Sequence, residues 1–172
     1  MIKFKDIKKG LTMENKHKEF LDEGIFEINQ GNFKKAIELI TKSIELKNDW
    51  EISYFYRAVA NQASNNFDEA ILDYTKALKI NPNMCDAFYN RAKIMLENKK
   101  DNCDIEKVIT DLTKALEIDD KFVDALFAMA AAQKKKGDYH SSLEYLEKLL
   151  QLEPEAIHAR ALKKLLLQKY IV

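Results

Sequence analysis

The chain has 172 residues, and its 28 basic and 28 acidic side chains give a formal net charge of zero. Balanced charge argues against a function dominated by nucleic acids or acidic membrane surfaces, and no run of about 18 apolar residues is present to form a spanning helix. Only 4 glycines and 2 prolines occur. This is well below the average usage of roughly 7% and 5% and predicts an almost wholly helical chain.

The first 12 residues, MIKFKDIKKGLT, are basic and mildly amphipathic. They lack the apolar core of about 7–15 residues that a secretory signal carries, so we expect a cytoplasmic protein. Two interpretations of residues 1–12 stay open. The segment is a flexible leader ahead of the first helix, or Ile2, Phe4 and Ile7 dock in a groove of this chain or of a neighbouring copy.

One amphipathic pattern then occurs four times, with successive starts 34, 38 and 34 residues apart. Each copy starts with Asn or Asp, which favours a helix N-cap because the side-chain oxygen accepts a backbone N–H. Three further positions, at spacings of four and three, share one helical face. The four copies carry Asn32, Ala36, Ile40 and Ser43; Asn66, Ala70, Tyr74 and Ala77; Asp104, Val108, Leu112 and Ala115; and Asp138, Ser142, Leu146 and Leu149. Such a period predicts stacked repeats of one supersecondary unit.

A second helical stretch precedes each copy, over about residues 17–30, 51–64, 85–98 and 123–136. Each stretch has a large apolar residue followed four positions later by a small one. These pairs are Phe20 and Gly24, Tyr54 and Ala58, Phe88 and Ala92, and Leu126 and Ala130. Because a small residue lets the partner helix approach closely, each repeat is predicted to be an antiparallel helical hairpin.

On these residues the chain resembles the tetratricopeptide repeat family. The repeats of that family show a large residue, a small one four later, a turn with glycine, an alanine, an aromatic residue and a closing proline. Gly31 and Gly137 occupy the turn position in the first and last repeats, and Pro82 and Pro154 close the second and fourth. The departures are Asn65 at one turn, Asn48 and Asp120 at two closing positions, and four extra residues near 100–103.

The resemblance covers residues 17–156 and implies an all-α fold, an α-solenoid with the form of a right-handed superhelix. We expect repeats at 17–50, 51–84, 85–122 and 123–156, within a segment 13–156, followed by a C-terminal capping helix at 157–172. The resemblance also implies a non-enzymatic scaffold without a cofactor, which binds another protein or peptide in the concave groove lined by the first helices.

The last helix does not continue the repeat, because Lys164 holds the position of the small residue. Its predicted apolar face consists of Ile157, Ala161 and Leu165, with Leu162, Leu166 and Lys169 on the neighbouring stripe. A cap of this kind covers the apolar flank of the last hairpin. Its end carries Leu167, Tyr170, Ile171 and Val172. These residues form a contact between two copies or pack back on the last repeat, and both possibilities stay open.

The positions that the resemblance assigns to the groove change in character along the chain. An apolar and aromatic floor in the first two repeats gives way to a mixed polar surface, so we expect an amphipathic helix or an extended apolar peptide to bind. The predicted binding residues are Leu21, Ile25, Ile28, Phe55, Tyr56, Val59, Tyr89, Asn90, Lys93 and Phe127. Two alternatives remain: several of these side chains pack helix on helix, or a second copy covers them in a homodimer.

The carboxylate clamp with which some family members bind chaperone tails is not expected here. Asp86 or Asp124 stands where a cation would have to meet the carboxylate of the tail, and like charges in a half-desolvated groove repel each other. No nucleophile elbow, phosphate loop or paired-carboxylate pattern is present, and we expect Asp and Glu where the helices meet water.

Metal sites and disulfides are not expected either. Cys85 and Cys103 lie 18 residues apart without a partner pattern, which argues against a zinc site or a disulfide framework. In the segment KDNCDIE, Cys103 and Ile105 occupy places where a calcium loop needs an oxygen ligand or a glycine, so a lengthened turn is expected there. The histidines, His17, His140 and His158, are predicted to lie on polar, solvated helix faces.

Overall fold

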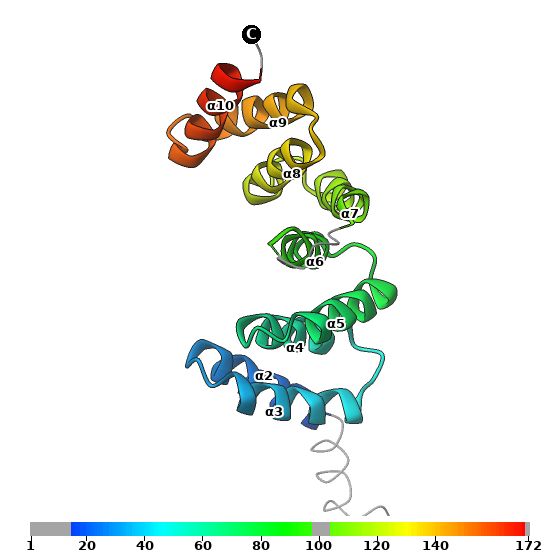
Figure 1. Ribbon diagram of the computed structural model, residues 1–172. Helices are drawn as coiled ribbons and strands as arrows, with labels where there is room; N and C mark the ends of the chain where they lie inside the picture. The colour runs from blue at the N-terminus through cyan, green and yellow to red at the C-terminus, as the bar shows by residue number, and fades with distance from the viewer. Residues whose placement is uncertain (1–14, 98–103, 171–172) are drawn as a thin grey trace, which may run out of the picture. The chain divides into compact units, whose positions relative to one another are not determined.

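The computed structural model describes residues 15–97 and 104–170, which form nine α-helices and, within those ranges, no strand (Figure 1). The helices are α2 (Lys16–Asn29), α3 (Phe33–Leu46), α4 (Glu51–Ala63), α5 (Phe67–Ile80), α6 (Cys85–Glu97), α7 (Ile105–Ile118), α8 (Val123–Lys136), α9 (Tyr139–Leu152) and α10 (Ile157–Lys169). The predicted all-α helical repeat is confirmed. The chain divides into a first unit that ends at Pro82 and a second that begins at Asn83.

The first unit contains two hairpins. Helix α2 packs on α3 and α4 packs on α5, while α3 and α4 join the two hairpins. The predicted face positions of α3 and α5 all have 0% exposure: Ala36, Ile40, Ser43, Ala70, Tyr74 and Ala77. The hairpin turns need a left-handed residue, which Gly31 supplies at φ +77° and Asn65 at φ +60°. Asn is one of the few residues besides glycine that adopts this conformation at low cost.

Close packing in the first hairpin depends on Gly24. A Cβ atom built at Gly24 would collide with Cγ1 of Ile40, and it would lie 3.1 Å from Cδ1 of the same side chain. Ile40 is itself fully buried, so it has little room to move aside. The predicted role of the small residue, to let the partner helix approach, is therefore confirmed at this position.

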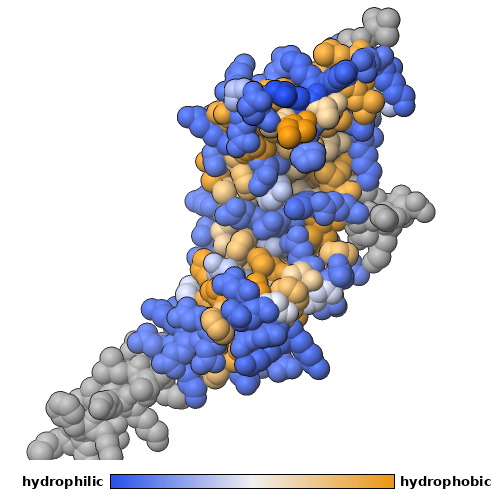
Figure 2. All heavy atoms as spheres, turned by 90° about the vertical axis from the view of Figure 1, so that its left-hand side faces the viewer, coloured by the Kyte–Doolittle hydropathy of each residue, from blue (hydrophilic) through white to orange (hydrophobic). Residues whose placement is uncertain are grey.

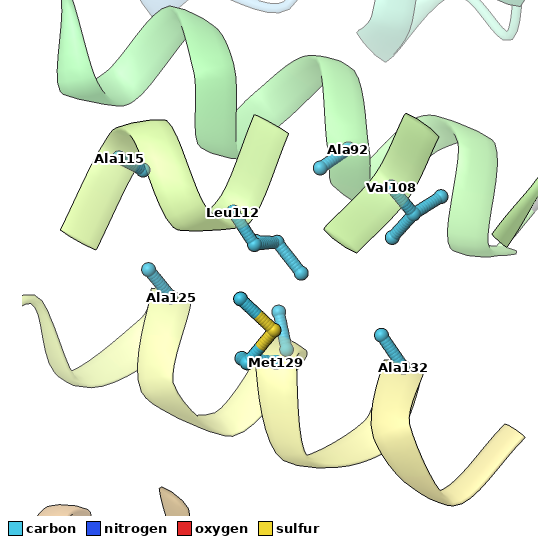
Figure 3. Packing of buried hydrophobic residues seen from close by; sticks show 8 residues of the cluster. Ala92, Val108, Leu112, Ala115, Ala125, Met129 and Ala132 are labelled. Atoms are coloured by element: carbon cyan, nitrogen blue, oxygen red, sulfur yellow. The ribbon is translucent and has the colours of Figure 1, made fainter. Parts of the chain in front are cut away.

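The second unit repeats the arrangement, with α6 against α7, α8 against α9, and α10 against α9. The core between α6, α7 and α8 consists of alanines around a few larger side chains, and Figure 3 shows Leu112 of α7 and Met129 of α8 pointing toward each other. Ala92 and Val108 are fully buried in the same cluster. The sequence predicted the contributions of α6 and α7 to this core.

Only two of the four predicted N-caps form. Asp104 accepts the backbone N–H of Lys107 and Asp138 accepts that of Ser141. Asn32 and Asn66 occupy the N-cap positions of α3 and α5 without a capping bond. Instead, their side-chain amides donate to a residue of the preceding helix: Asn32 to Glu27 at 2.7 Å and Asn66 to Asn61 at 3.5 Å. An ionised Asp has no donor and cannot be drawn away in this manner.

The apolar face of α10 differs from the prediction. Ala159, Leu162 and Leu166 pack against α8 and α9, whereas Ile157 is 73% exposed. The ring of Tyr170 stacks on that of Tyr139, the first residue of α9, at a centroid distance of 4.1 Å. This contact favours packing back on the last repeat for Tyr170.

Some predictions lie outside the described residues: the leader 1–12, the lengthened turn near 100–103, and the final residues Ile171 and Val172. None of the helices in the described ranges is both long enough and apolar enough to cross a membrane.

Candidate partner-binding surface

The first helices of the second and third hairpins are fixed to their partners by an ion pair whose carboxylate is nearly buried. Arg57 of α4 donates from Nε and Nη2 to the two carboxylate oxygens of Asp73, at 2.8 and 2.7 Å. Arg91 of α6 makes the same bidentate contact with Asp111, both bonds being 2.7 Å. Charge-assisted, two-point contacts of this kind fix orientation as well as distance.

The sequence prediction that Asp and Glu lie in water is wrong for Asp73 and Asp111, whose side chains are only 9% and 8% exposed. Each Arg follows the large residue of its first helix by three positions, and each Asp precedes the large residue of its second helix by one. The recurrence of both charges at equivalent repeat positions is the signal that could have revealed the pairs. The Arg and Asp of a pair are 16 residues apart in the second repeat and 20 apart in the third, because the third repeat has four extra residues.

The pair in the first unit belongs to a larger polar network. Nη1 of Arg57 donates to the hydroxyl of Thr41 on α3 at 3.1 Å, and the side-chain amide of Asn61 donates to Asp73 at 3.3 Å. The Asp73 carboxylate raises the pKa of the Arg57 guanidinium, so this side chain carries its charge at any working pH. Arg57 thereby joins the two hairpins of the unit.

Helices α2 and α4 carry most of the predicted binding residues of the first unit. Ile25 and Ile28 on α2, and Phe55, Tyr56 and Val59 on α4, are all half-buried. The ring of Phe55 lies edge-on to Tyr56, at a centroid distance of 5.4 Å, and to the buried Tyr74, at 5.7 Å. These apolar side chains are accessible and already held in one arrangement.

Leu21 does not belong to that surface. Its side chain is 2% exposed and lies in the core, so its assignment as a groove residue needs correction. Helix α2 packs against α4 as well as against α3. Less of its surface is therefore exposed than if α3 were its only neighbour.

In the second unit the predicted residues fall into two places. Tyr89 is half-buried, with its ring 4.9 Å from that of Phe122 and Nζ of Lys93 lying 5.9 Å from its centroid. Burial raises the pKa of the Tyr89 hydroxyl. The next residue in sequence, Asn90, is also half-buried. Phe127 packs instead against the cluster formed by α8, α9 and α10.

Phe127 also lines a hollow that the sequence did not predict. The hollow has a volume of about 510 Å³ and is lined by Phe127, Ala131, Lys134, Lys135, His158 and Leu162. Four of these side chains come from α8 and two from α10. The sequence analysis assigns α10 to a cap or to a contact between two copies, and neither prediction includes a hollow shared with α8.

Family models of the tetratricopeptide repeat match residues 52–84 and 123–155. These are the two repeats closed by Pro82 and Pro154, and both coincide with hairpins of the structure. The chain is a tetratricopeptide repeat protein. Tetratricopeptide repeats are in general non-enzymatic modules that bind other proteins, which supports a role in protein–protein interaction for this one.

Solved structures of other tetratricopeptide repeat proteins share its fold. MamA from Desulfovibrio magneticus RS-1 matches with a TM-score of 0.82 and 16% identity, over 90% of this chain and 85% of that one. PilF from Pseudomonas aeruginosa gives 0.77 and 19%, over 91% and 70%. The tetratricopeptide repeat domain of Arabidopsis OM64 gives 0.64 and 26%, over 69% and 95%. A search of curated protein sequences gives no match.

One predicted solvated histidine of this tetratricopeptide repeat protein is buried. His17 packs edge-on against the ring of Trp50 at a centroid distance of 4.9 Å, and its Nε2 has no hydrogen-bond partner among residues 15–97 and 104–170. The histidine lies at the start of the first helix, where the polarity of Lys16 and Lys18 suggested a water-facing surface. His140 and His158 are exposed as expected.

Apolar side chains also remain on the surface where no groove was predicted. Phe26 on α2 is 60% exposed and Leu72 on α5 is 70% exposed. Figure 2 shows one face of the molecule, on which apolar patches are interrupted by hydrophilic side chains. Scattered apolar residues of this kind are common on protein surfaces, so a binding function has to be assigned to a cluster rather than to a single residue.

The thiol of Cys85 is half-buried, and burial raises its pKa. A thiol with a raised pKa holds little thiolate at neutral pH and reacts slowly. Cys103 lies outside the described residues.

Proposed function

We propose that this tetratricopeptide repeat protein is a non-enzymatic scaffold that binds a peptide or a helix of a partner protein on the exposed faces of its first helices. The observation that carries the proposal is the cluster of half-buried apolar side chains on α2 and α4: Ile25, Ile28, Phe55, Tyr56 and Val59. An amphipathic helix or an extended apolar segment matches such a surface, because its own apolar side chains leave water on binding.

The rigid mounting of these side chains favours binding. Phe55 is held by ring contacts on two sides, and α4 is fixed to α5 by the bidentate contact of Arg57 with Asp73. Side chains that are already ordered lose little conformational entropy when a partner covers them, so more of the buried apolar area contributes to affinity.

The test is affinity capture of partners from a lysate of the organism's own cells, quantified by mass spectrometry. The wild type is compared with the double variant Ile25→Lys and Val59→Lys, which places two charges on the proposed surface. Leu72→Lys is the control for an added positive charge, since it places one such charge at an exposed apolar position of the same unit. Circular dichroism checks that each variant is folded.

The proposal expects the double variant to lose a specific set of proteins that the wild type and Leu72→Lys both retain. An identical set from all three would contradict it and leave the fold unaffected. A peptide of the captured partner, titrated against the purified chain, then measures the affinity directly.

Self-association through α10 is the second candidate, favoured by Ile157 at 73% exposure and by Leu165 and Leu167 at 43% and 44%. These side chains belong to one short helix, whereas a stable interface buries about 800 Å² on each partner. Sedimentation analysis of the wild type against Ile157→Lys with Leu165→Lys tests this candidate. A wild-type chain that stays monomeric at the highest attainable concentration excludes it.

A further inference from the structure

The hollow between α8 and α10 combines an apolar floor with a basic rim. Phe127, Ala131 and Leu162 form the apolar part, while Lys134, Lys135 and His158 supply cationic or protonatable groups. No acidic side chain lines it. The hollow lies entirely within the second unit and does not include the proposed surface on α2 and α4.

Within the described residues, no carboxylate pairs with the lysines of this rim. Within the described residues neither Lys134 nor Lys135 forms an ion pair, although Nζ of Lys135 lies 3.5 Å from the carbonyl oxygen of Leu96. Neighbouring lysines are different: Lys136 pairs with Glu106 at 2.8 Å and Lys163 pairs with Glu147 at 3.0 Å. In the part of the chain that the structure describes, no carboxylate thus pairs with either rim lysine, although the ammonium of Lys135 donates to a backbone carbonyl of α6.

Basic residues at a helix C-terminus also interact favourably with the helix dipole, and this effect alone would explain a lysine there. However, the last turns of α2, α4 and α6 contain no basic residue, whereas α8 has three. Helix stability does not require this charge, because the three equivalent first helices form without it. The basic turn is a particular feature of the helix that borders the hollow.

We infer that this hollow is a docking site for an acidic segment of a partner protein, in which Asp or Glu residues flank an apolar side chain. The apolar side chain covers Phe127 and Leu162, and the carboxylates meet Lys134 and Lys135. Complementary charge around an apolar contact fixes register and speeds association. The inference rests on the proposed scaffold function and adds a second site with its own chemistry.

A nucleic acid or an anionic membrane fits the hollow less well. Both present many phosphates over an extended surface and need a correspondingly extended basic patch. Here two lysines border an apolar floor, and the chain carries no net charge. The position of the lysines also differs from the family's carboxylate clamp, in which one cation position falls on Asp86 or Asp124.

The experiment measures binding of the full chain to a short fluorescein-labelled peptide in which Glu, Leu and Ser alternate, by fluorescence anisotropy. The comparison peptide has Gln in place of every Glu. The test variant is Lys134→Glu with Lys135→Glu. The matched control is Lys107→Glu with Lys114→Glu on α7, which changes the net charge equally but lies away from the hollow. Ala131→Phe fills the hollow without changing the charge.

The inference expects the Glu peptide to bind more tightly than the Gln peptide. The affinity of the Glu peptide should fall about tenfold in the Lys134 and Lys135 variant and in Ala131→Phe. It should change less than about twofold in the control. Equal losses in the test and control variants, or no effect of Ala131→Phe, would overturn the inference, because the attraction would then be long-range charge alone.

Two further arms separate this site from the alternatives. Ile25→Lys in the first unit should leave peptide binding unchanged, so a failed scaffold test on α2 and α4 does not decide this one. Tighter binding of phosphatidylserine vesicles or of oligothymidine than of the Glu peptide would assign the surface to another class of partner and overturn the inference.

Discussion

The ion pair between Arg57 and Asp73 is expected to contribute strongly to the stability of the first unit. The side chains are 22% and 9% exposed, so neither is fully solvated once its partner is removed. Asp73→Ala removes two charge-assisted hydrogen bonds from Arg57, each worth about 1.5–3 kcal/mol. Water reaches part of the guanidinium and offsets some of the loss. We expect a cost of about 2–4 kcal/mol.

Arg57→Met is expected to cost more, about 3–5 kcal/mol, because it leaves a nearly buried carboxylate with only the amide of Asn61 as donor. The double variant Arg57→Met with Asp73→Leu should lie within about 1 kcal/mol of the wild type, since no unpaired charge remains. The two single effects are thus strongly non-additive, and the cycle measures the coupling between the two side chains.

Urea unfolding gives these free energies, followed by far-ultraviolet circular dichroism and by the fluorescence of Trp50, the only tryptophan of the chain. Thr41→Val is the control within the same network, because it removes a single hydrogen bond to Arg57. It should cost about 0.5–1.5 kcal/mol. Single variants that each cost under about 1 kcal/mol, or a coupling energy near zero, would refute the assigned role of the pair.

Three other changes test separate features of the fold. His17→Phe should raise the free energy of unfolding by about 1 kcal/mol, because it removes an unpaired buried nitrogen and keeps the ring contact with Trp50. Thermal melting checks this, and a melting temperature that does not rise contradicts it. Gly24→Ala should destabilise by about 1 kcal/mol, since the clash with Cγ1 of Ile40 exceeds the gain in helix propensity, and in urea unfolding the same change should cost less in an Ile40→Ala background, which has no Cγ1 atom. The N–H and hydroxyl of Ser141 lower the pKa of Asp138 below its ordinary value, so its stabilisation is present above about pH 4 and is lost as the pH falls through the lowered pKa. Melting temperatures across this range should show a smaller acid loss for Asp138→Asn.

The sequence was sufficient to predict the hairpins because each repeat position has one environment. Ile40, Tyr74, Leu112 and Leu146 occupy one such position, and all four have 0% exposure. Their periodicity is local, and burial of one helical face follows from it directly. The helix bounds were within a few residues of the prediction for the same reason.

Features that depend on a single pair of side chains could not be predicted in this way. His17 has ordinary polar neighbours in sequence, and its burial depends on Trp50, which belongs to the next hairpin. The failure of the Asn32 cap similarly depends on Glu27, an acceptor across the turn. Leu21 was placed on the groove from its repeat position, although the extent of its burial depends on the packing of α2 against its neighbours.

The ion pairs show how this fold separates stability from recognition. The positions of Arg57 and Asp73 carry Met129 and Tyr145 in the fourth hairpin, and these pack in an apolar cluster. Since both solutions support the same hairpin, this contact can vary in chemistry as long as the first helix is held. The exposed side of that helix is under even weaker structural constraint and changes from Val59 in the second hairpin to Lys93 in the third. We therefore expect the identity of the partner to be set by exposed positions such as these, and the framework beneath them to tolerate their substitution.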